Sequence, residues 1–319
     1  MSSYTINRKT ANKFLSFLLS IVYGLFIIFS IQRLYLLGSG DINAYVDFFE
    51  NIDLFTTFNE YSIRGDGVFR LGVVFLSDFF NAETITVLSY LAFTISTSVF
   101  WIYSANIRSS KYLIYILPLF LMVFLTPMVS NLFASSIRSG IAFTVLLIAF
   151  VYCKSYNKYI LFILSSLIHL SMVPIISLYF LFYILNNMRI KSPFIIPLLL
   201  LLAFSFFITL ASKIYQFNTT TVTSSFFFNF LIFYVGLLVI FINKKAIKNI
   251  YGFISVALFL IFIWGVFFDL SFMRYIGFAI IFYLFFLIER GETGTIQVFT
   301  IGYIPFFALT IFYTIANTL

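Results

Sequence analysis

Apolar runs long enough to cross a lipid bilayer recur along the whole of this 319-residue chain. The first extends from Phe14 to Leu37, and a helix needs only about 20 apolar residues to cross the hydrocarbon core. Only 9% of the residues are charged, whereas a soluble domain carries about 25%. So few charges cannot cover a water-facing surface. The runs are continuous rather than alternating, which predicts helices.

We therefore expect an all-α polytopic membrane protein with about 10–12 transmembrane or half-membrane helices. It would form a single integral membrane domain over residues 1–319, with no soluble domain. Long spans are expected at 14–37, 84–104, 112–127, 139–153, 193–212, 224–242, 252–268, 275–289 and 295–317. Short helices are expected at 67–80, 159–169 and 172–187.

The positive charges indicate an orientation, because cytoplasmic loops of membrane proteins are enriched in Lys and Arg. Basic interruptions of the apolar sequence nearly alternate with acidic or hydroxyl-rich ones at 38–66, 128–137, 213–223 and 268–274. The basic group contains Arg8, Lys9, Lys13, Arg108, Lys111, Lys154, Lys158, Arg189, Lys191, Lys244, Lys245, Lys248 and Arg290. With that group inside, the N-terminus is cytoplasmic and 38–66 is the long outer loop. The net charge of +8 then needs no nucleic-acid partner.

Six cations remain on the other side, and five of them are arginines. A topological signal can use lysine equally well, whereas a site that grips phosphate or carboxylate prefers the planar guanidinium. The six are Arg33, Arg64, Arg70, Arg138, Lys213 and Arg274. This bias predicts an anion site on the outer face.

Two of these arginines are expected to open helices. Arg138 lies in "SNLFASSIRSGIAF" and Arg274 in "FFDLSFMRYIGF", five residues after Asp269. The first turn of a helix offers unpaired N–H groups and the positive end of the helix dipole, so an arginine there makes an anion cradle. The alternative for Arg138 is a side chain that reaches the lipid headgroups. The alternative for Arg274 is a local ion pair with Asp269.

His169 is the single histidine, and it lies near the middle of the stretch between Lys158 and Arg189. That stretch is too short for two ordinary spans and too long for one. We expect two short helices that meet at "HLSMVP", with His169 and Ser171 at the apex. The imidazole suits a general base near neutral pH. The alternative is a hydrogen-bonded core histidine.

The acidic stretch 38–66 and the "RGDGVFR" that ends it complete the set of candidates. Six carboxylates lie between Asp41 and Asp66, in a segment that resembles an amphipathic cap with its aromatic residues on the membrane and its acids in water. Their spacing lacks the central glycine of a calcium loop, so we assign no metal. Phosphate-binding loops and serine-hydrolase elbows are also absent from the sequence. Candidate substrate contacts here are Glu60, Arg64, Asp66 and Arg70.

The order of these motifs resembles the EpsG-like and Wzy-type polymerases of bacterial surface polysaccharides. The resemblance rests on "DINAY", "SSIRSGIAF", "SSLIHLS" and "FMRYIGF", which together extend from about Asp41 to Tyr275. Two departures are the serine at 139, where a Gln-like residue is expected, and "RGDGVF", where a Glu-Pro-Gly-like entry is expected. They leave open the roles of Glu60, Asp66 and Arg70.

The resemblance implies a GT-C-like membrane glycosyltransferase in the bacterial cytoplasmic (inner) membrane. It would transfer a growing glycan from undecaprenyl pyrophosphate to a lipid-linked repeat unit, and would make O-antigen of lipopolysaccharide, capsule or exopolysaccharide. It implies no metal, no cofactor and no nucleotide sugar, with a chain-length regulator and a flippase as further partners. By position, the catalytic residues would be Arg138, His169 and Arg274. The substrate contacts would include Ser171 and Asp269, as well as Asp41 and Tyr45, which match the family's Asp-x-x-x-Tyr opening.

Two other functions remain open. A flippase for lipid-linked oligosaccharides would also place cations at a cavity, although such transporters usually show internal repeats, and we find none. A membrane O-acyltransferase that modifies surface glycans could use His169, but it would need that residue near cytoplasmic acyl-CoA.

Overall fold

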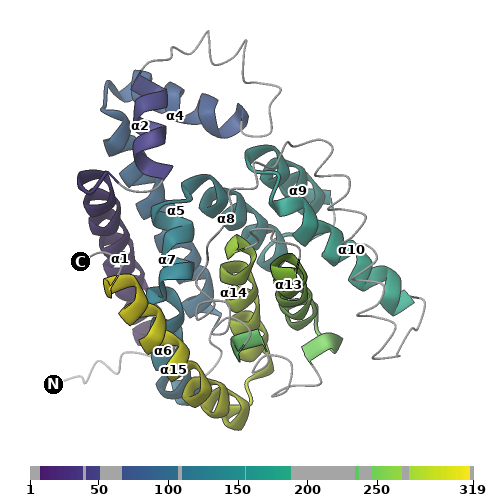
Figure 1. The fold of residues 1–319 in the computed structure, drawn as a ribbon. Helices are drawn as coiled ribbons and strands as arrows, with labels where there is room; N and C mark the ends of the chain where they lie inside the picture. Colours follow the sequence, from purple (N-terminus) through teal and green to yellow (C-terminus); the bar gives the residue numbers. More distant parts are fainter. Residues whose placement is uncertain are drawn as a thin grey trace, which may run out of the picture. The chain divides into compact units, whose positions relative to one another are not determined.

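The structure is a computed structural model of the full chain (Figure 1). It describes residues 8–38, 41–50, 67–106, 110–154, 156–187, 234–236, 246–267 and 273–316. Within these ranges the side chains of 8–12, 41, 110–115, 263–267, 273–274 and 313–316 lie outside the description.

The described part of the chain is helical and contains no strand. The α-helices are α1 (Arg8–Leu36), α2 (Asp41–Glu50), α4 (Gly67–Phe80), α5 (Thr84–Ala105), α6 (Ser110–Leu125), α7 (Pro127–Ala134), α8 (Ile137–Val151), α9 (Tyr156–Ile168), α10 (Met172–Asn187), α13 (Ile250–Phe267), α14 (Met273–Arg290) and α15 (Thr293–Ala316). A short 3₁₀ helix, η1 (Ala246–Lys248), precedes α13.

Helices occur at ten of the positions expected from the sequence, including the three short ones. The other two expected spans, 193–212 and most of 224–242, lie outside the described residues. The sequence interpretation was wrong about residues 127–134, most of which it assigned to a polar interruption and which form α7. Residues 41–50 of the expected outer loop form α2, and the exposed acids of this helix agree with the amphipathic cap expected there. Pro127 is the first residue of α7, where its missing N–H and fixed φ suit a helix start.

Three helical segments are long and apolar enough to cross a membrane: Lys13–Leu36, Thr84–Ala105 and Thr293–Phe312. The count for the described residues rises to four if α6 and α7 form one broken span. Many apolar side chains of α1 remain exposed, for example Phe14, Val22 and Phe29, which are 61–68% exposed. Large exposed apolar side chains along a long helix fit contact with lipid. These features indicate a membrane protein.

The chain divides into two compact units. The first consists of Met1–Ser110 and Ser130–Val173, and the second of Lys111–Val129 and Pro174–Leu319.

In the first unit, α5 packs against both α1 and α8, and α8 packs against α9. Close approach depends on small residues. A Cβ atom on Gly24 of α1 would collide with Phe93 and Thr97 of α5. Ser165 of α9 donates a buried 2.8 Å hydrogen bond to the carbonyl oxygen of Ala142 in α8. Small residues and such interhelical bonds join helices in lipid, where burial of apolar surface gives little driving force.

In the second unit, α13 and α14 form a closely packed pair. The hydroxyl of Ser255 donates a buried 2.7 Å hydrogen bond to the carbonyl oxygen of Ala279. Every side chain from Ile276 to Ile288 is buried. A helix that is apolar and buried on all sides forms the centre of its unit.

Candidate functional site

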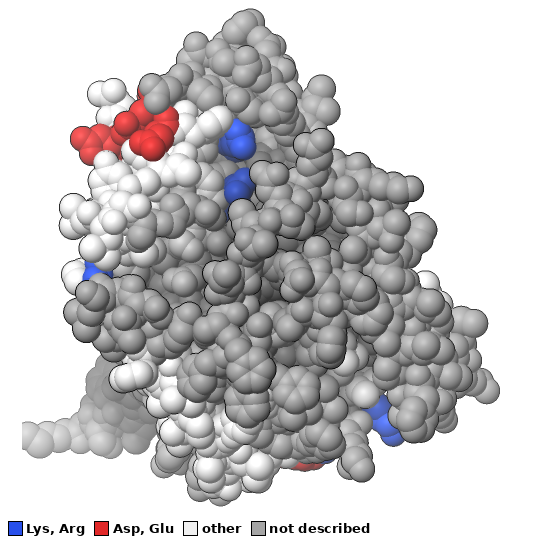
Figure 2. Space-filling view, viewed as in Figure 1, with Lys and Arg blue, Asp and Glu red and all other residues white. Residues whose placement is uncertain are grey.

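Helix α2 supplies most of the wall of the candidate site. Its buried residues, Ile42, Tyr45, Val46 and Phe49, follow the i, i+3, i+4, i+7 spacing of an amphipathic helix. Asp47 and Glu50 are exposed on the other side. Figure 2 shows acidic side chains gathered at the upper left, in the region that α2 and α4 occupy in Figure 1.

The aromatic residues of α2 pack against protein. Phe69 of α4 packs against two of them, with its ring centroid 5.7 Å from that of Tyr45 and 6.0 Å from that of Phe49. Edge-on contacts at such distances stabilise an aromatic cluster. The sequence had suggested that these rings rest on the membrane, and this was wrong for Tyr45 and Phe49, which are buried against α4.

Arg138 is the second residue of α8, so the expectation that it opens a helix is confirmed. The entry to α8 is tight, because a Cβ atom on Gly140 would lie 2.6 Å from the carbonyl oxygen of Leu132 in α7. Glycine at 140 lets the start of α8 approach α7 closely. The close contact between the start of α8 and the backbone of α7 therefore fixes the position of Arg138.

The guanidinium of Arg138 is anchored on Tyr45. Its Nε donates a 2.7 Å hydrogen bond to the hydroxyl oxygen of Tyr45, and its Cζ lies 5.1 Å from the centre of the same ring. A cation within about 6 Å of an aromatic face is attracted to it. The Nε bond uses one of the five N–H donors of the guanidinium.

Arg70 of α4 is placed in a similar way by the next aromatic residue of α2. Its Cζ lies 4.3 Å from the ring centre of Phe48. Tyr45 and Phe48 are three residues apart, so they lie on the same side of the helix. One helix therefore presents an aromatic ring to each of two arginines.

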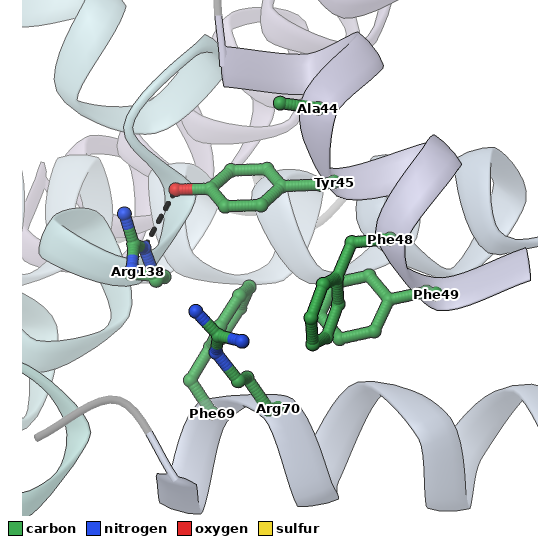
Figure 3. Close-up of a pocket in the computed structure, with 7 residues that line it drawn as sticks. All are labelled: Ala44, Tyr45, Phe48, Phe49, Phe69, Arg70 and Arg138. Carbon is green, nitrogen blue, oxygen red and sulfur yellow. Dashed lines mark hydrogen bonds between the residues drawn. The ribbon is translucent and has the colours of Figure 1, made fainter. Parts of the chain in front are cut away.

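These side chains line a pocket of about 210 Å³ in the first unit. Its described lining residues are Ala44, Tyr45, Phe48, Phe49, Phe69, Arg70 and Arg138. Figure 3 shows both guanidinium groups pointing into the space beside the aromatic rings, and the hydrogen bond between Arg138 and Tyr45. The volume lies below the roughly 300–1,000 Å³ of pockets for drug-sized ligands. It suits a small anionic group.

Two cations in one small pocket favour an anionic occupant. Like charges repel each other, and an anion between them replaces repulsion with attraction. Guanidinium groups bind phosphate and carboxylate through paired N–H donors. The aromatic rings keep water from one side of the site and strengthen such contacts.

His169 and Ser171 lie in the turn between α9 and α10, so the predicted junction of two short helices at this point is confirmed. The N–H of His169 donates to the carbonyl oxygen of Ser165, and the carbonyl oxygen of His169 accepts from the N–H of Met172. Pro174 falls in the first turn of α10, where its missing N–H breaks no helical bond. Neither His169 nor Ser171 is among the described lining residues of the pocket.

The remaining predicted residues are placed only in part. Asp41 is the first residue of α2 and Arg274 the second of α14, which confirms that Arg274 opens a helix, but both side chains lie outside the description. Glu60, Arg64, Asp66 and Asp269 lie outside the described residues. Their roles stay predictions.

Three aromatic members of the site escaped the sequence reading: Phe48, Phe49 and Phe69. The signal was available for α2, because "DINAYVDFFE" carries apolar residues at helical spacing. Phe69 could not be separated from the many phenylalanines of the chain without tertiary contacts.

No family model, no curated protein and no solved structure matches this chain.

Proposed function

We propose that the chain is a membrane glycosyltransferase that polymerises bacterial surface polysaccharide, with the Arg70–Arg138 pocket as the binding site for pyrophosphate. The observation that carries the proposal is the pair of guanidinium groups held on aromatic rings in an otherwise apolar helical protein. The motif resemblance supports the choice of reaction. The GT-C-like architecture is part of the proposal.

The reaction transfers a growing glycan from its lipid carrier to the sugar of a repeat unit that is attached to a second lipid carrier. The bond between the anomeric carbon of the donor glycan and the pyrophosphate oxygen breaks, and both electrons leave with the lipid pyrophosphate. A hydroxyl oxygen of the acceptor sugar forms the new glycosidic bond, and its proton passes to a base. Preplaced cations stabilise the negative charge that develops on the leaving pyrophosphate.

Each residue then has a defined role. Arg138 and Arg70 hold the departing pyrophosphate, and Arg274 contributes a third positive charge. His169 receives the proton of the acceptor hydroxyl. In support, α9 ends one residue before His169 and packs against α8, which carries Arg138. Ser171, Asp269 and the acids of 41–66 are assigned to the sugars.

The chemistry takes place on the outer face of the bacterial cytoplasmic membrane, with the N-terminus inside. The substrates are undecaprenyl-pyrophosphate-linked oligosaccharides, and a flippase and a chain-length regulator act beside the enzyme. Reporter fusions after residues 137 and 169 test this topology. Cytoplasmic signals at both positions would contradict it.

The decisive test is deletion of the gene, followed by gel analysis of surface polysaccharide and complementation with variants. We expect the deletion to remove long polymer and keep single repeat units on their acceptor. Arg138→Lys keeps the charge but loses the forked donor geometry, so it should restore little polymer. Wild-type polymer from Arg138→Lys would refute the bidentate grip. Loss of all surface glycan, single units included, would instead indicate a flippase.

A further inference from the structure

We propose that Tyr45 is a positioning residue that fixes the guanidinium of Arg138 for an anionic ligand, rather than a residue that contacts the ligand. This inference rests on the proposed pyrophosphate site and changes the role of Tyr45 within it, because the sequence alone had assigned Tyr45 to the substrate. The observations that support it are the choice of nitrogen, the ring contact and the burial of Tyr45.

The choice of nitrogen is informative. The hydroxyl of Tyr45 accepts a 2.7 Å hydrogen bond from Nε of Arg138. Nε joins the aliphatic part of the side chain to Cζ, so a hydrogen bond from Nε restricts rotation of the guanidinium plane. The edge that carries the two terminal nitrogens can bind phosphate bidentately.

The ring of Tyr45 adds a second restraint. The Cζ of Arg138 lies 5.1 Å from the ring centre, so one side chain contacts the guanidinium both through its hydroxyl and through its face. Arginine loses considerable rotamer freedom on binding, and a side chain held in place beforehand loses less at that moment. Anchoring therefore raises affinity without a contact between Tyr45 and the ligand.

Tyr45 itself is rigidly held. It is 9% exposed, and its ring packs against Phe49 and Phe69, with centroid distances of 6.3 and 5.7 Å. A buried ring with such neighbours can hold a hydroxyl at a fixed point. A side chain that contacts sugars in several positions would need more rotational freedom than this packing allows.

A double-mutant cycle separates positioning from direct contact. The full-length protein in detergent is titrated with farnesyl pyrophosphate, with farnesol as the control without the anion and inorganic pyrophosphate as the control without the lipid. The variants are Tyr45→Phe, Arg138→Lys and the double variant. Tyr45→Phe removes the hydroxyl and keeps the ring, while lysine has no Nε.

We expect Tyr45→Phe to weaken farnesyl pyrophosphate binding about tenfold in the wild-type background. In the Arg138→Lys background the same change should alter affinity by less than about twofold, because the bond it removes is already gone. Thermal unfolding midpoints of all variants should match the wild type. A purely structural role of Tyr45 would lower that midpoint in both backgrounds.

Three results would overturn the inference. An equal loss in both backgrounds means that Tyr45 contacts the ligand directly. No loss from Tyr45→Phe in the wild-type background means that the hydroxyl does not act. If Arg138→Lys also leaves affinity unchanged, the pocket is not the pyrophosphate site, and the inference fails with that part of the proposed function. Strong coupling together with normal polymer in cells that lack the gene would refute only the polymerase activity.

Discussion

The α13–α14 pair and the pocket around Arg138 use the same aromatic-rich composition in different ways. In α14, thirteen consecutive residues from Ile276 to Ile288 are buried, and one serine hydroxyl bonds across to the helix from α13. In the pocket, Phe48 and Arg70 are only half-buried, and rings serve as supports for cations. The comparison teaches that aromatic side chains fill volume in one region and orient charge in the other.

This difference predicts that loss of an aromatic ring changes a different property in each region. In the packed pair, removal of a ring leaves a cavity and should reduce stability. In the pocket, it leaves the fold intact and should reduce ligand affinity.

The largest expected effect on stability comes from Phe282→Ala in α14. Phe282 is fully buried and stacks 6.4 Å from Tyr251. We expect a loss of about 2 kcal/mol in the free energy of unfolding, since lipid solvates the unfolded helix and mainly the cavity part of the usual penalty remains. Chemical denaturation in detergent micelles measures it. Phe282→Leu, the control, should lose clearly less, and equal losses would contradict the cavity argument.

A smaller and different effect is expected from Phe48→Leu in the pocket. Loss of the ring under Arg70 should weaken farnesyl pyrophosphate binding about two- to fivefold, as expected for a partly exposed cation–π contact. Isothermal titration measures the affinity. Phe29→Leu on the exposed side of α1 is the matched control and should change nothing. A lower unfolding midpoint with unchanged affinity would show that Phe48 is a packing residue after all.

The smallest effect is expected at a single hydrogen bond between α9 and α8. Ser165 bonds across to Ala142, whereas its neighbour Ser166 bonds within its own helix to Phe162. Ser165→Ala should reduce stability by about 0.6 kcal/mol, the average found for interhelical bonds in membranes. Ser166→Ala should leave it almost unchanged. Equal values for the two variants would mean that the interhelical bond adds nothing to packing.

Much of the helical framework could be predicted from the sequence. Runs such as Phe14–Leu37 can form only helices in lipid, because every backbone polar group must be paired within the segment. The helix starts at Arg138 and Arg274 and the break at His169 were also predicted correctly. These features depend on neighbours in the chain, which the sequence displays.

The amphipathic character of α2 was visible in the sequence, but the partner of its apolar side was not. The aromatic residues were expected on the membrane, and the six carboxylates between Asp41 and Asp66 in water. The buried side of α2 became clear only through its contacts with Phe69. A short amphipathic helix can rest its apolar side on lipid or on protein, so tertiary contact decides between the two.

The sequence by itself determined that this chain is a helical membrane protein with few charged residues. Hydrophobic length and charge are local properties, so no tertiary information was needed. Only the tertiary structure decided that Arg70 and Arg138, 68 positions apart in the sequence, line one pocket. It also decided that Tyr45 anchors Arg138 through Nε. Which side chains meet depends on how the helices pack, and many packings share the same apolar pattern.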